Sequence, residues 1–306
     1  MERRSSPLAG IALMLSAMAL LPCIDVLAKK LGEAGLPILI VVWARAAFGT
    51  LLTLPFALRA NGPSVLLPQR PVLHLLRAAL LFGATWLFFM SLTYLPIANA
   101  LAIFFVNPLV VTILSALVLR ERVGPRRWAA VAVGFIGTLI IIRPGMVEMN
   151  PGTLYALTAG LALGSYFVST RALAGSANAS VLSLHTTGMG LLLMTLAMPA
   201  VWVPPTSVQW LMLAGVGVIA TFGHVLITWA YERAEASLLA PLAFTEIVTA
   251  TLLGWWFWGH LPDSWTVLGV CVLVGSAVYI SIREHEAGKR RVNGALPGVA
   301  NRASEA

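Results

Sequence analysis

Ten long apolar runs occupy most of this 306-residue chain, and only short polar segments separate them. A helix needs about 20 apolar residues to cross the hydrocarbon core of a bilayer. The chain is 59% hydrophobic and 10% charged, whereas a soluble domain carries about 25% charged residues. We therefore predict an all-α membrane protein with ten transmembrane helices. These helices cover residues 8–28, 37–58, 72–93, 96–119, 127–143, 152–172, 179–201, 207–231, 236–258 and 264–282.

Basic residues collect in every second connection between these runs. Of the 20 Lys and Arg residues, 16 fall on one side, Lys29, Lys30 and Arg143 fall on the other, and Arg45 lies within a span. Short cytoplasmic loops retain Lys and Arg during insertion, so we predict that both termini are cytoplasmic in a bacterial inner (plasma) membrane. A nucleic-acid surface would gather these charges on one face, and their spread over several loops argues against it.

The sequence also contains an internal duplication. Segment 10–31 aligns with 152–173, and segment 104–123 aligns with 243–262, in both cases without gaps. Each copy holds five spans, an odd number, so the second copy must enter the membrane from the opposite side. Inverted repeats of this kind are common in secondary transporters, which bind substrate near the membrane midplane. We predict a first repeat at 8–143, a second repeat at 152–283 and a disordered cytoplasmic tail at 284–306.

The second alignment pairs Asn107 with Glu246 and Phe105 with Phe244. Glu246 lies about 10 residues into its span, which corresponds to a depth of about 15 Å. A carboxylate at such a depth costs several kcal/mol unless it faces a partner or a wet cavity. We predict that Glu246 and Asn107 flank a central site where Glu246 binds substrate or a proton. The alternative is a structural hydrogen bond to another helix.

Asp25 and Arg45 form a second candidate pair, nearer to the outer face. Asp25 follows Pro22, which removes a backbone hydrogen bond, and Arg45 reaches a similar depth on the returning helix. We predict that the two side chains meet and form a binding or gating pair. The alternative is that Asp25 caps its helix near the interface, while Lys29 and Lys30 snorkel to the surface.

Five further residues complete the candidate site. His74 and Arg77 share one helical face near the cytoplasmic end, because they are three residues apart, and we predict that they form a gate together with His224. A histidine can also relay protons near neutral pH. Lipid headgroups and packing hydrogen bonds are the alternative partners of these side chains. Tyr166 and Trp86 are predicted to line the cavity.

Motifs for other chemistry are absent from the sequence. No G-x-x-x-x-G-K-[ST] phosphate loop and no H-E-x-x-H zinc motif occurs, and Asp25 and Asp263 are the only aspartates. We therefore predict no catalytic residue, no cofactor and no metal site, with a membrane enzyme or scaffold as the alternative class. The expected partners are a small-molecule substrate, the lipid bilayer and protons as the candidate coupling ion, in a monomer or homodimer.

Several motifs give the chain a family resemblance. They are the dipeptide Asn107-Pro108, LRER at 119–122 and RRWAAVAVGFIG at 126–137. Together with two copies of five spans, they resemble the EamA family of the drug/metabolite transporter superfamily. The resemblance covers nearly all of residues 8–283.

Three shorter motifs narrow this resemblance. DVLAKKLG at 25–32, HLLR at 74–77 and APLAFTE at 240–246 look like S-adenosylmethionine uptake carriers, and riboflavin carriers are similar at a lower level. The resemblance implies a secondary-active transporter of a small polar or amphipathic metabolite, such as an S-adenosylmethionine-like or amino-acid-like solute, by alternating access. An uncoupled or proton-independent exchanger of another metabolite, such as riboflavin, is the alternative.

Overall fold

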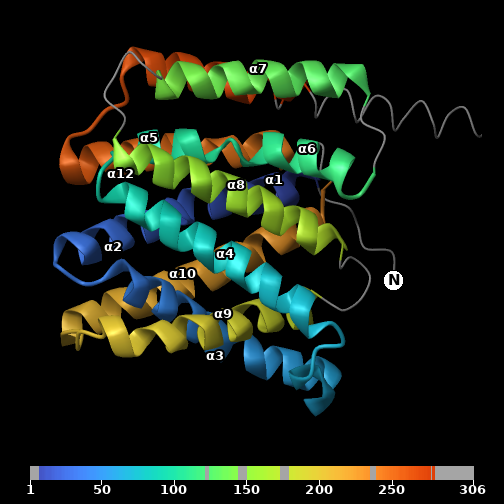
Figure 1. Cartoon of the computed structure of the whole chain (residues 1–306), viewed down its shortest axis with the longest axis vertical. Helices are drawn as coiled ribbons and strands as arrows, with labels where there is room; N and C mark the ends of the chain where they lie inside the picture. The colour runs from blue at the N-terminus through green and yellow to red at the C-terminus, as the bar shows by residue number, and fades with distance from the viewer. Residues whose placement is uncertain are drawn as a thin grey trace, which may run out of the picture.

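The computed structural model describes residues 7–120, 124–143, 150–172, 179–234, 239–276 and 278–279. These residues form helices with short connections, and no β-strand occurs among them. The helices run roughly along one common axis, which lies horizontally in Figure 1. The predicted all-α class is confirmed. The predicted tail, 284–306, lies outside the described residues.

The first copy contains seven α-helical pieces and one short 3-10 turn. They are α1 (Pro7–Leu20), α2 (Pro22–Glu33), α3 (Ile38–Asn61), η1 (Pro63–Leu66), α4 (Pro71–Leu92), α5 (Ile97–Phe104), α6 (Asn107–Leu117) and α7 (Pro125–Ile142).

The second copy has a similar order of elements. They are α8 (Pro151–Ala172), α9 (Ala179–Val201), α10 (Ser207–Tyr231), η2 (Ala240–Phe244), α12 (Thr245–Trp258) and a final helix, Ser264–Ser276.

Six segments within the described residues are long and apolar enough to cross a membrane. They are Leu8–Glu33, Ile38–Arg59, Pro71–Leu92, Ile97–Leu117, Val181–Val201 and Ser207–Tyr231. The shorter apolar helices Val131–Ile142, Leu242–Trp258 and Ser264–Ser276, together with α8, account for the four remaining predicted spans. The prediction of ten membrane helices in two copies of five is confirmed.

Three of the predicted spans are interrupted. The first span breaks between α1 and α2, where Pro22 opens the second piece. Two further spans were predicted as continuous, and that detail was wrong. The span 96–119 divides into α5 and α6, and the span 236–258 divides into η2 and α12. Pro108 lies in the first turn of α6 and Pro241 in that of η2. A proline has no N–H to continue the ladder of the preceding turn, which favours a break.

The sequence also fixes where other helices begin and end. Thr206 and Gln209 form a reciprocal capping box at the start of α10. The Thr206 hydroxyl accepts from the backbone N–H of Gln209 at 3.3 Å, and the side-chain Oε1 of Gln209 accepts from the backbone N–H of Thr206 at 2.9 Å. Gly259 ends α12 with φ of 70°, a left-handed conformation that favours glycine. These residues set the lengths of α10 and α12, which both contribute to the site below.

Small residues bring α8 against the broken helix α5–α6. A Cβ atom on Gly160 would lie 2.7 Å from the carbonyl oxygen of Phe104, and one on Gly164 would lie 2.7 Å from the Cβ of Val110. Only glycine permits so close an approach of two backbones. The contact packs the break between α5 and α6 against α8, which is continuous at this point.

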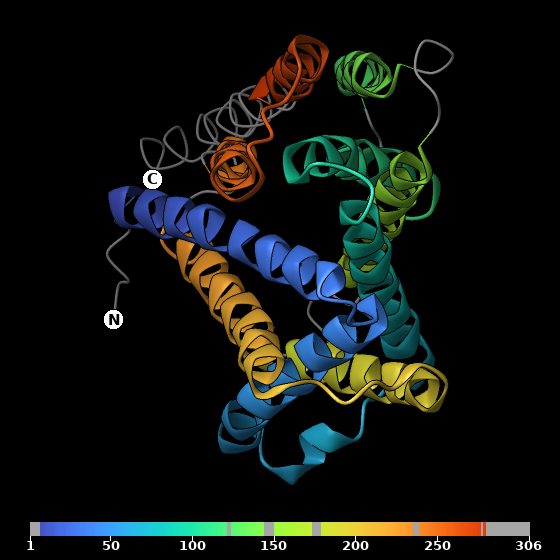
Figure 2. The same cartoon turned by 90° about the vertical axis from the view of Figure 1, so that its left-hand side faces the viewer.

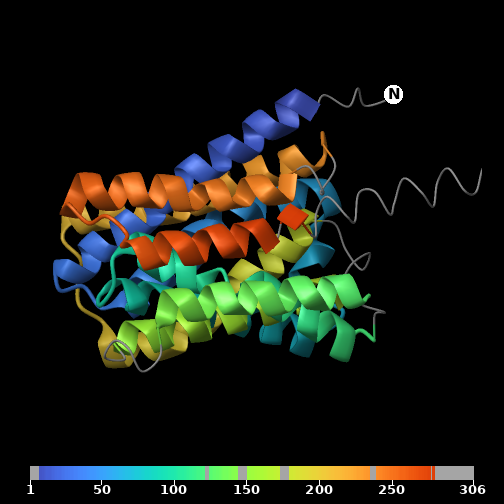
Figure 3. The same cartoon turned by 90° about the horizontal axis from the view of Figure 1, so that it is seen from above.

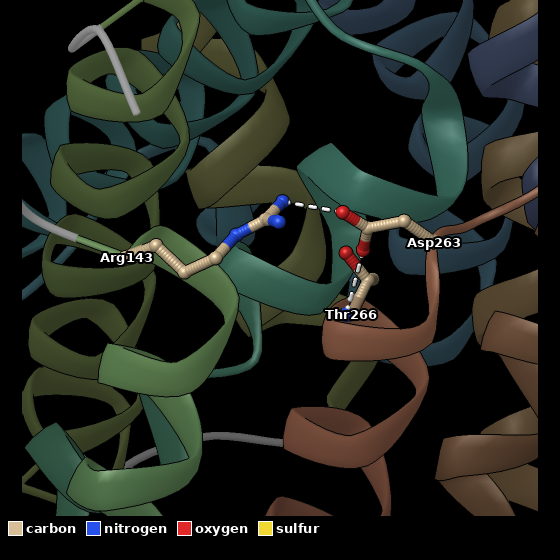
Figure 4. Close-up of polar contacts among 3 residues, drawn as sticks. All are labelled: Arg143, Asp263 and Thr266. Atoms are coloured by element: carbon tan, nitrogen blue, oxygen red, sulfur yellow. Dashed lines mark hydrogen bonds and ion pairs between the residues drawn. The ribbon is translucent and has the colours of Figure 1, made fainter. Parts of the chain in front are cut away.

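The last helices of the two copies, α7 and Ser264–Ser276, lie side by side at one edge of the molecule (Figures 1 and 3). A Cβ on Gly137 would lie 2.9 Å from the carbonyl oxygen of Gly269, so the two backbones are in close contact. Figure 4 shows the ion pair at one end of this contact, where Arg143 Nη2 donates to Asp263 Oδ2 at 2.5 Å. The other carboxylate oxygen accepts from the Thr266 N–H at 2.8 Å and caps the final helix.

Candidate functional site

A cavity of about 660 Å³ lies between the two copies. Figure 2 looks along the helices and shows α1 and α10, in blue and orange, opposite the teal and green helices α4 to α6 and α8. The cavity wall is mostly apolar, as is usual for small-molecule sites. Its polar lining residues are Asp25, Arg45, Thr85, Asn107, Thr112, Tyr166, His224, Tyr231, Glu246 and Ser276.

Each of three helix breaks delivers one polar residue to this cavity. Asp25 lies in the first turn of α2, Asn107 is the first residue of α6, and Glu246 is the second residue of α12. A half-helix that begins inside a membrane protein leaves backbone N–H groups without helical partners and carries partial positive charge at that end. The breaks therefore place three of the polar wall residues, and the partial positive charge at a helix start favours a negative group beside it.

The two carboxylates face the cavity without a partner in the described part of the chain. Neither Asp25 nor Glu246 forms a hydrogen bond or an ion pair there. Asp25 is buried, and it lies close enough to Glu246 and Arg45 to interact electrostatically with both. Two neighbouring carboxylates in an apolar wall attract a cation, because each is costly to keep ionised alone.

Arg45 lies on α3 and faces the same cavity. Its Nη1 donates to the Thr85 hydroxyl of α4, and the guanidinium lies 5.8 Å from the centre of the Phe82 ring. Among the described residues, no hydrogen bond or ion pair joins Asp25 to Arg45, whose guanidinium binds Thr85 of α4. The binding or gating role of the pair stays a prediction. The three charged side chains line one cavity as separate groups, two negative and one positive.

Asn107 has a structural partner as well as a place in the wall. Its side-chain amide donates to the Phe104 carbonyl oxygen at 3.0 Å. This carbonyl lies at the end of α5, where the break removes the usual donor. The amide therefore stabilises the break, and its oxygen remains available at the cavity.

Six phenylalanines belong to the apolar wall. They are Phe88, Phe89, Phe104, Phe105, Phe167 and Phe244. Phe88 and Phe104 lie 4.6 Å apart between ring centres, and Phe105 and Phe244 lie 5.0 Å apart. Sequence reasoning missed these residues, because nothing in an apolar run distinguishes a ring that faces a cavity from one that faces lipid. Flat rings of this kind can stack on a planar ligand.

Two predicted gate residues lie behind the cavity wall. Arg77 donates to the Thr170 hydroxyl at 2.9 Å and to the Tyr166 hydroxyl at 3.3 Å. His74 is buried with its ring 4.6 Å from that of His185. Neither His74 nor Arg77 lines the cavity itself. Arg77 reaches it only through Tyr166, which does.

Of the remaining two candidates, one lies in the cavity wall and the other does not. His224, predicted as a gate residue, is part of the cavity wall on α10. Trp86, predicted to line the cavity, instead packs against the main hydrophobic core and is not part of that wall. The structure therefore brings Asp25, Arg45 and Glu246 together with four further side chains predicted or present in the wall: Asn107, Tyr166, His224 and Thr85.

Lys29 departs from the sequence-based alternative. Snorkelling to the surface is wrong for this residue, because its side chain is buried and its Nζ donates to the carbonyl oxygens of Leu92 and Leu95 at 2.7 and 2.9 Å. Asp25 likewise does not cap a helix end at the interface, since it lines the cavity. Within the described residues, no three His, Cys, Asp or Glu side chains lie close enough together to hold a metal ion.

The chain matches the model of the EamA-like transporter family twice, over residues 8–143 and 150–282. It is 30% identical over 300 residues to a riboflavin transporter of Vibrio cholerae, which covers 96% of this chain and 99% of the relative. It is 26% identical over 276 residues to an S-adenosylmethionine uptake transporter of Rickettsia prowazekii, covering 90% and 93% of the two chains.

Two further similarities concern an exporter and a solved structure. The chain is 28% identical over 282 residues to the pseudopaline exporter CntI of Pseudomonas aeruginosa, covering 89% of this chain and 95% of the relative. A crystal structure aligns with a TM-score of 0.60 at 22% identity, covering 93% of this chain and 99% of that one. The structural match supports the fold alone.

Proposed function

Because the chain belongs to the EamA-like transporter family, we propose that its cavity carries a metabolite combining a cationic group, a carboxylate and a flat apolar part. The protein is a multi-pass membrane transporter of small metabolites. Secondary-active alternating access would expose the cavity to each side of the membrane in turn, as the two copies move against each other.

One observation carries this proposal: two carboxylates, which have no partner among the described residues, and one guanidinium line the same cavity, whose wall includes six phenylalanines. A substrate ammonium or other cation would bind between Asp25 and Glu246 and neutralise both. A substrate carboxylate would accept hydrogen bonds from Arg45, whose planar fork suits two oxygens. A planar ring would stack on the phenylalanines.

S-adenosylmethionine-like solutes fit this arrangement best. Such a solute has a sulfonium and an ammonium for the carboxylates, a carboxylate for Arg45 and an adenine ring for the aromatic wall. The name of the Rickettsia relative supports this substrate class. A smaller amino-acid-like solute would use the same charged groups and leave the aromatic wall partly unused.

Riboflavin is the second candidate. The Vibrio relative supports it by name, and the phenylalanine wall suits a flat ring. Riboflavin has no ammonium group, however, so Asp25 and Glu246 would have no cation to bind. Replacing Glu246 by Gln therefore separates the two candidates, since it removes a charge that only the cationic substrate needs.

We also propose that protons are coupled through Glu246. When the substrate cation leaves, Glu246 and Asp25 remain together in an apolar wall, and a proton can replace the cation. The alternative, a proton-independent exchanger, predicts that a pH gradient does not drive accumulation.

The remaining assignments follow from charge and family. Both termini would face the cytoplasm of a bacterial inner membrane, because the basic residues collect on that side. The repeats would divide at 8–143 and 152–283. We propose that the protein is a carrier and no enzyme, that it binds no nucleic acid, and that it acts as a monomer or homodimer.

Thermal stability of the purified protein in detergent tests the substrate class. We expect S-adenosylmethionine to raise the Tm of the parent, and S-adenosylhomocysteine, which lacks the sulfonium, to raise it less. Glu246→Gln should weaken S-adenosylmethionine binding about 30-fold, because losing one member of a buried charge pair costs at least about 2 kcal/mol. Glu232→Gln removes a carboxylate that is not part of the cavity wall and serves as the control.

Two results would contradict the proposal. One is equal stabilisation of the parent and Glu246→Gln by S-adenosylmethionine. The other is stabilisation by riboflavin alone, which would favour the second candidate. Uptake into proteoliposomes with and without an imposed pH gradient then decides whether protons are coupled.

A further inference from the structure

We propose that Lys29, Glu33 and Trp258 form an outer gate, a contact between the two copies that closes the cavity at the end where α2 and α12 finish. This inference rests on the proposed function, because a gate has meaning only in a carrier whose cavity opens to two sides. The outer side is the one opposite the basic loops.

Lys29 ties α2 to the end of α4. Its ammonium donates to the carbonyl oxygens of Leu92 and Leu95, at 2.7 and 2.9 Å, although these residues lie far away in the sequence. Leu92 is the last residue of α4, where carbonyl groups lack helical donors and the helix end carries partial negative charge. A buried ammonium is thus stabilised at the outer end of the first copy.

Trp258 then joins this cluster to the second copy. It is the last residue of α12, and its indole Nε1 donates to Glu33 Oε1 at 2.7 Å. Its ring lies 5.4 Å from Lys29 Nζ, and Lys30 Nζ lies 4.5 Å from the neighbouring Phe257 ring. A cation over an aromatic face is attracted by the ring quadrupole. The charged end of α2 therefore holds the aromatic end of α12.

The position of these contacts relative to the cavity makes them a gate. The last residue of α2 in the cavity wall is Asp25, and from α12 only Glu246 contributes, in its first turn. At the opposite end, the wall reaches Tyr231, the last residue of α10. Among the described residues, the wall thus ends short of the outer ends of α2 and α12, where the cluster lies.

These contacts also suit a gate that must reopen. Glu33 is exposed, so when the contact opens, water can replace the hydrogen bond between the Trp258 indole and the Glu33 carboxylate. The polar part of the contact is one hydrogen bond and cation–π interactions between helix ends, although the Trp258 ring also packs against the main hydrophobic core. Separating α2 from α12 would open a path from the outer face to Asp25.

Alkylation of a cavity cysteine tests the gate without reference to any substrate. Cys23 and Cys271 are replaced by Ala, and Leu101→Cys places a reporter in the cavity wall. A membrane-impermeant maleimide is added to intact cells or to inverted vesicles, and the labelling rate is measured from each side. If another solute proves to be carried, this measurement is unaffected, so failure of the gate and failure of the substrate assignment are distinguishable.

We expect Trp258→Phe and Glu33→Ala each to raise the labelling rate from outside about tenfold and to lower it from inside, because both weaken the outward-closed state. Trp256→Phe is the matched control, since this neighbouring indole is 76% exposed, and its rates should match the parent. Lys29→Met should give the largest increase.

Three results would overturn the gate. They are an unchanged outside rate in both Trp258→Phe and Glu33→Ala, an equal increase in Trp256→Phe, or an increase from both sides at once. The last result would indicate general loosening. Glu33 is exposed, so its substitution leaves the fold intact and the test holds even if Lys29→Met fails to fold.

Discussion

Phe105 and Phe244 contact each other with ring centres 5.0 Å apart, and the sequence alignment of the two copies pairs these two residues. Residues related by a two-fold operation can touch only near its axis. The pseudo-symmetry axis therefore passes beside the cavity wall. Each ring also precedes a half-helix that carries a polar wall residue, Asn107 in one copy and Glu246 in the other.

A double-mutant cycle on this pair should reveal coupling. We expect Phe105→Leu and Phe244→Leu to be non-additive by about 0.5–1.5 kcal/mol, the range for aromatic pairs beyond their buried area. Unfolding of the single and double variants in detergent measures it. Phe135→Leu on α7 is the control partner, because Phe135 is 53% exposed, and its effect should simply add to that of Phe105→Leu. Additivity in the Phe105–Phe244 cycle would contradict the contact.

Gly164→Ala should lower the Tm, because the added Cβ would lie 2.7 Å from the Cβ of Val110 and 3.0 Å from the Asn107 carbonyl oxygen. Overpacking of this kind costs about 1–3 kcal/mol. Gly188→Ala on α9 is the matched control, since nothing lies within 4 Å of its added Cβ and alanine is the better helix former by about 1 kcal/mol. Thermal unfolding should therefore move in opposite directions for the two variants, and a neutral Gly164→Ala would contradict the close approach of α8 and α6.

Asp263 supports stability in a pH-dependent way. Hydrogen bonding by Thr266 and then the Arg143 guanidinium lower the pKa of the Asp263 carboxyl. A lowered folded-state pKa means that the stabilisation is present above the unfolded value of about 3.9 and is lost as the pH falls through the folded value. Asp263→Asn, which retains a capping oxygen, should cost less than about 1 kcal/mol at pH 7, because exposed ion pairs are weak.

Asp263→Ala removes the cap as well and should cost about 1 kcal/mol more. Unfolding of both variants is compared with the parent at about pH 7 and at about pH 3, below the unfolded pKa. The difference between the parent and Asp263→Asn should shrink at the lower pH. A difference that persists or grows in acid would contradict the role of the Asp263 charge.

The helix positions were predictable because each span is an apolar run long enough to cross a bilayer. The breaks within two spans were harder to foresee, since both sides of each break are equally apolar. Pro108 was the available signal for the division of α5 from α6, because a proline inside an apolar run removes a helical donor. The equivalence of Phe105 with Phe244 came from the alignment alone, and the structure brings the two rings into contact.

The site was only partly predictable. Asp25, Arg45 and Glu246 stand out in a sequence, because ionised groups are rare and costly in lipid. The partners of these groups do not stand out in the sequence. Arg45 binds a threonine of another helix, and Lys29 binds two backbone carbonyls, which have no signature in a sequence. Long-range main-chain acceptors of this kind become visible only once the helices are packed.

Thr85 should determine how well the transporter recognises a carboxylate, although it carries no charge. Its hydroxyl accepts from Arg45 and donates to the Leu81 carbonyl oxygen at 2.9 Å, which fixes the hydroxyl and, through it, the guanidinium over the Phe82 ring. Thr85→Val keeps the shape but removes the acceptor, and a hydrogen bond to a charged group contributes about 1.5–3 kcal/mol.

We therefore expect Thr85→Val to raise the KM for a carboxylate-bearing substrate about tenfold or more and to lower the Tm, because the buried guanidinium loses its acceptor. Thr85→Ser, which retains the hydroxyl, should stay near the parent. The methyl ester of the same substrate serves as the control, since it presents no carboxylate to Arg45. Its transport should therefore be the same in the parent and in both variants. Uptake into proteoliposomes measures these constants. If Thr85→Val lowers transport of acid and ester alike, the hydroxyl supports the cavity wall in general and does not hold Arg45 for a carboxylate.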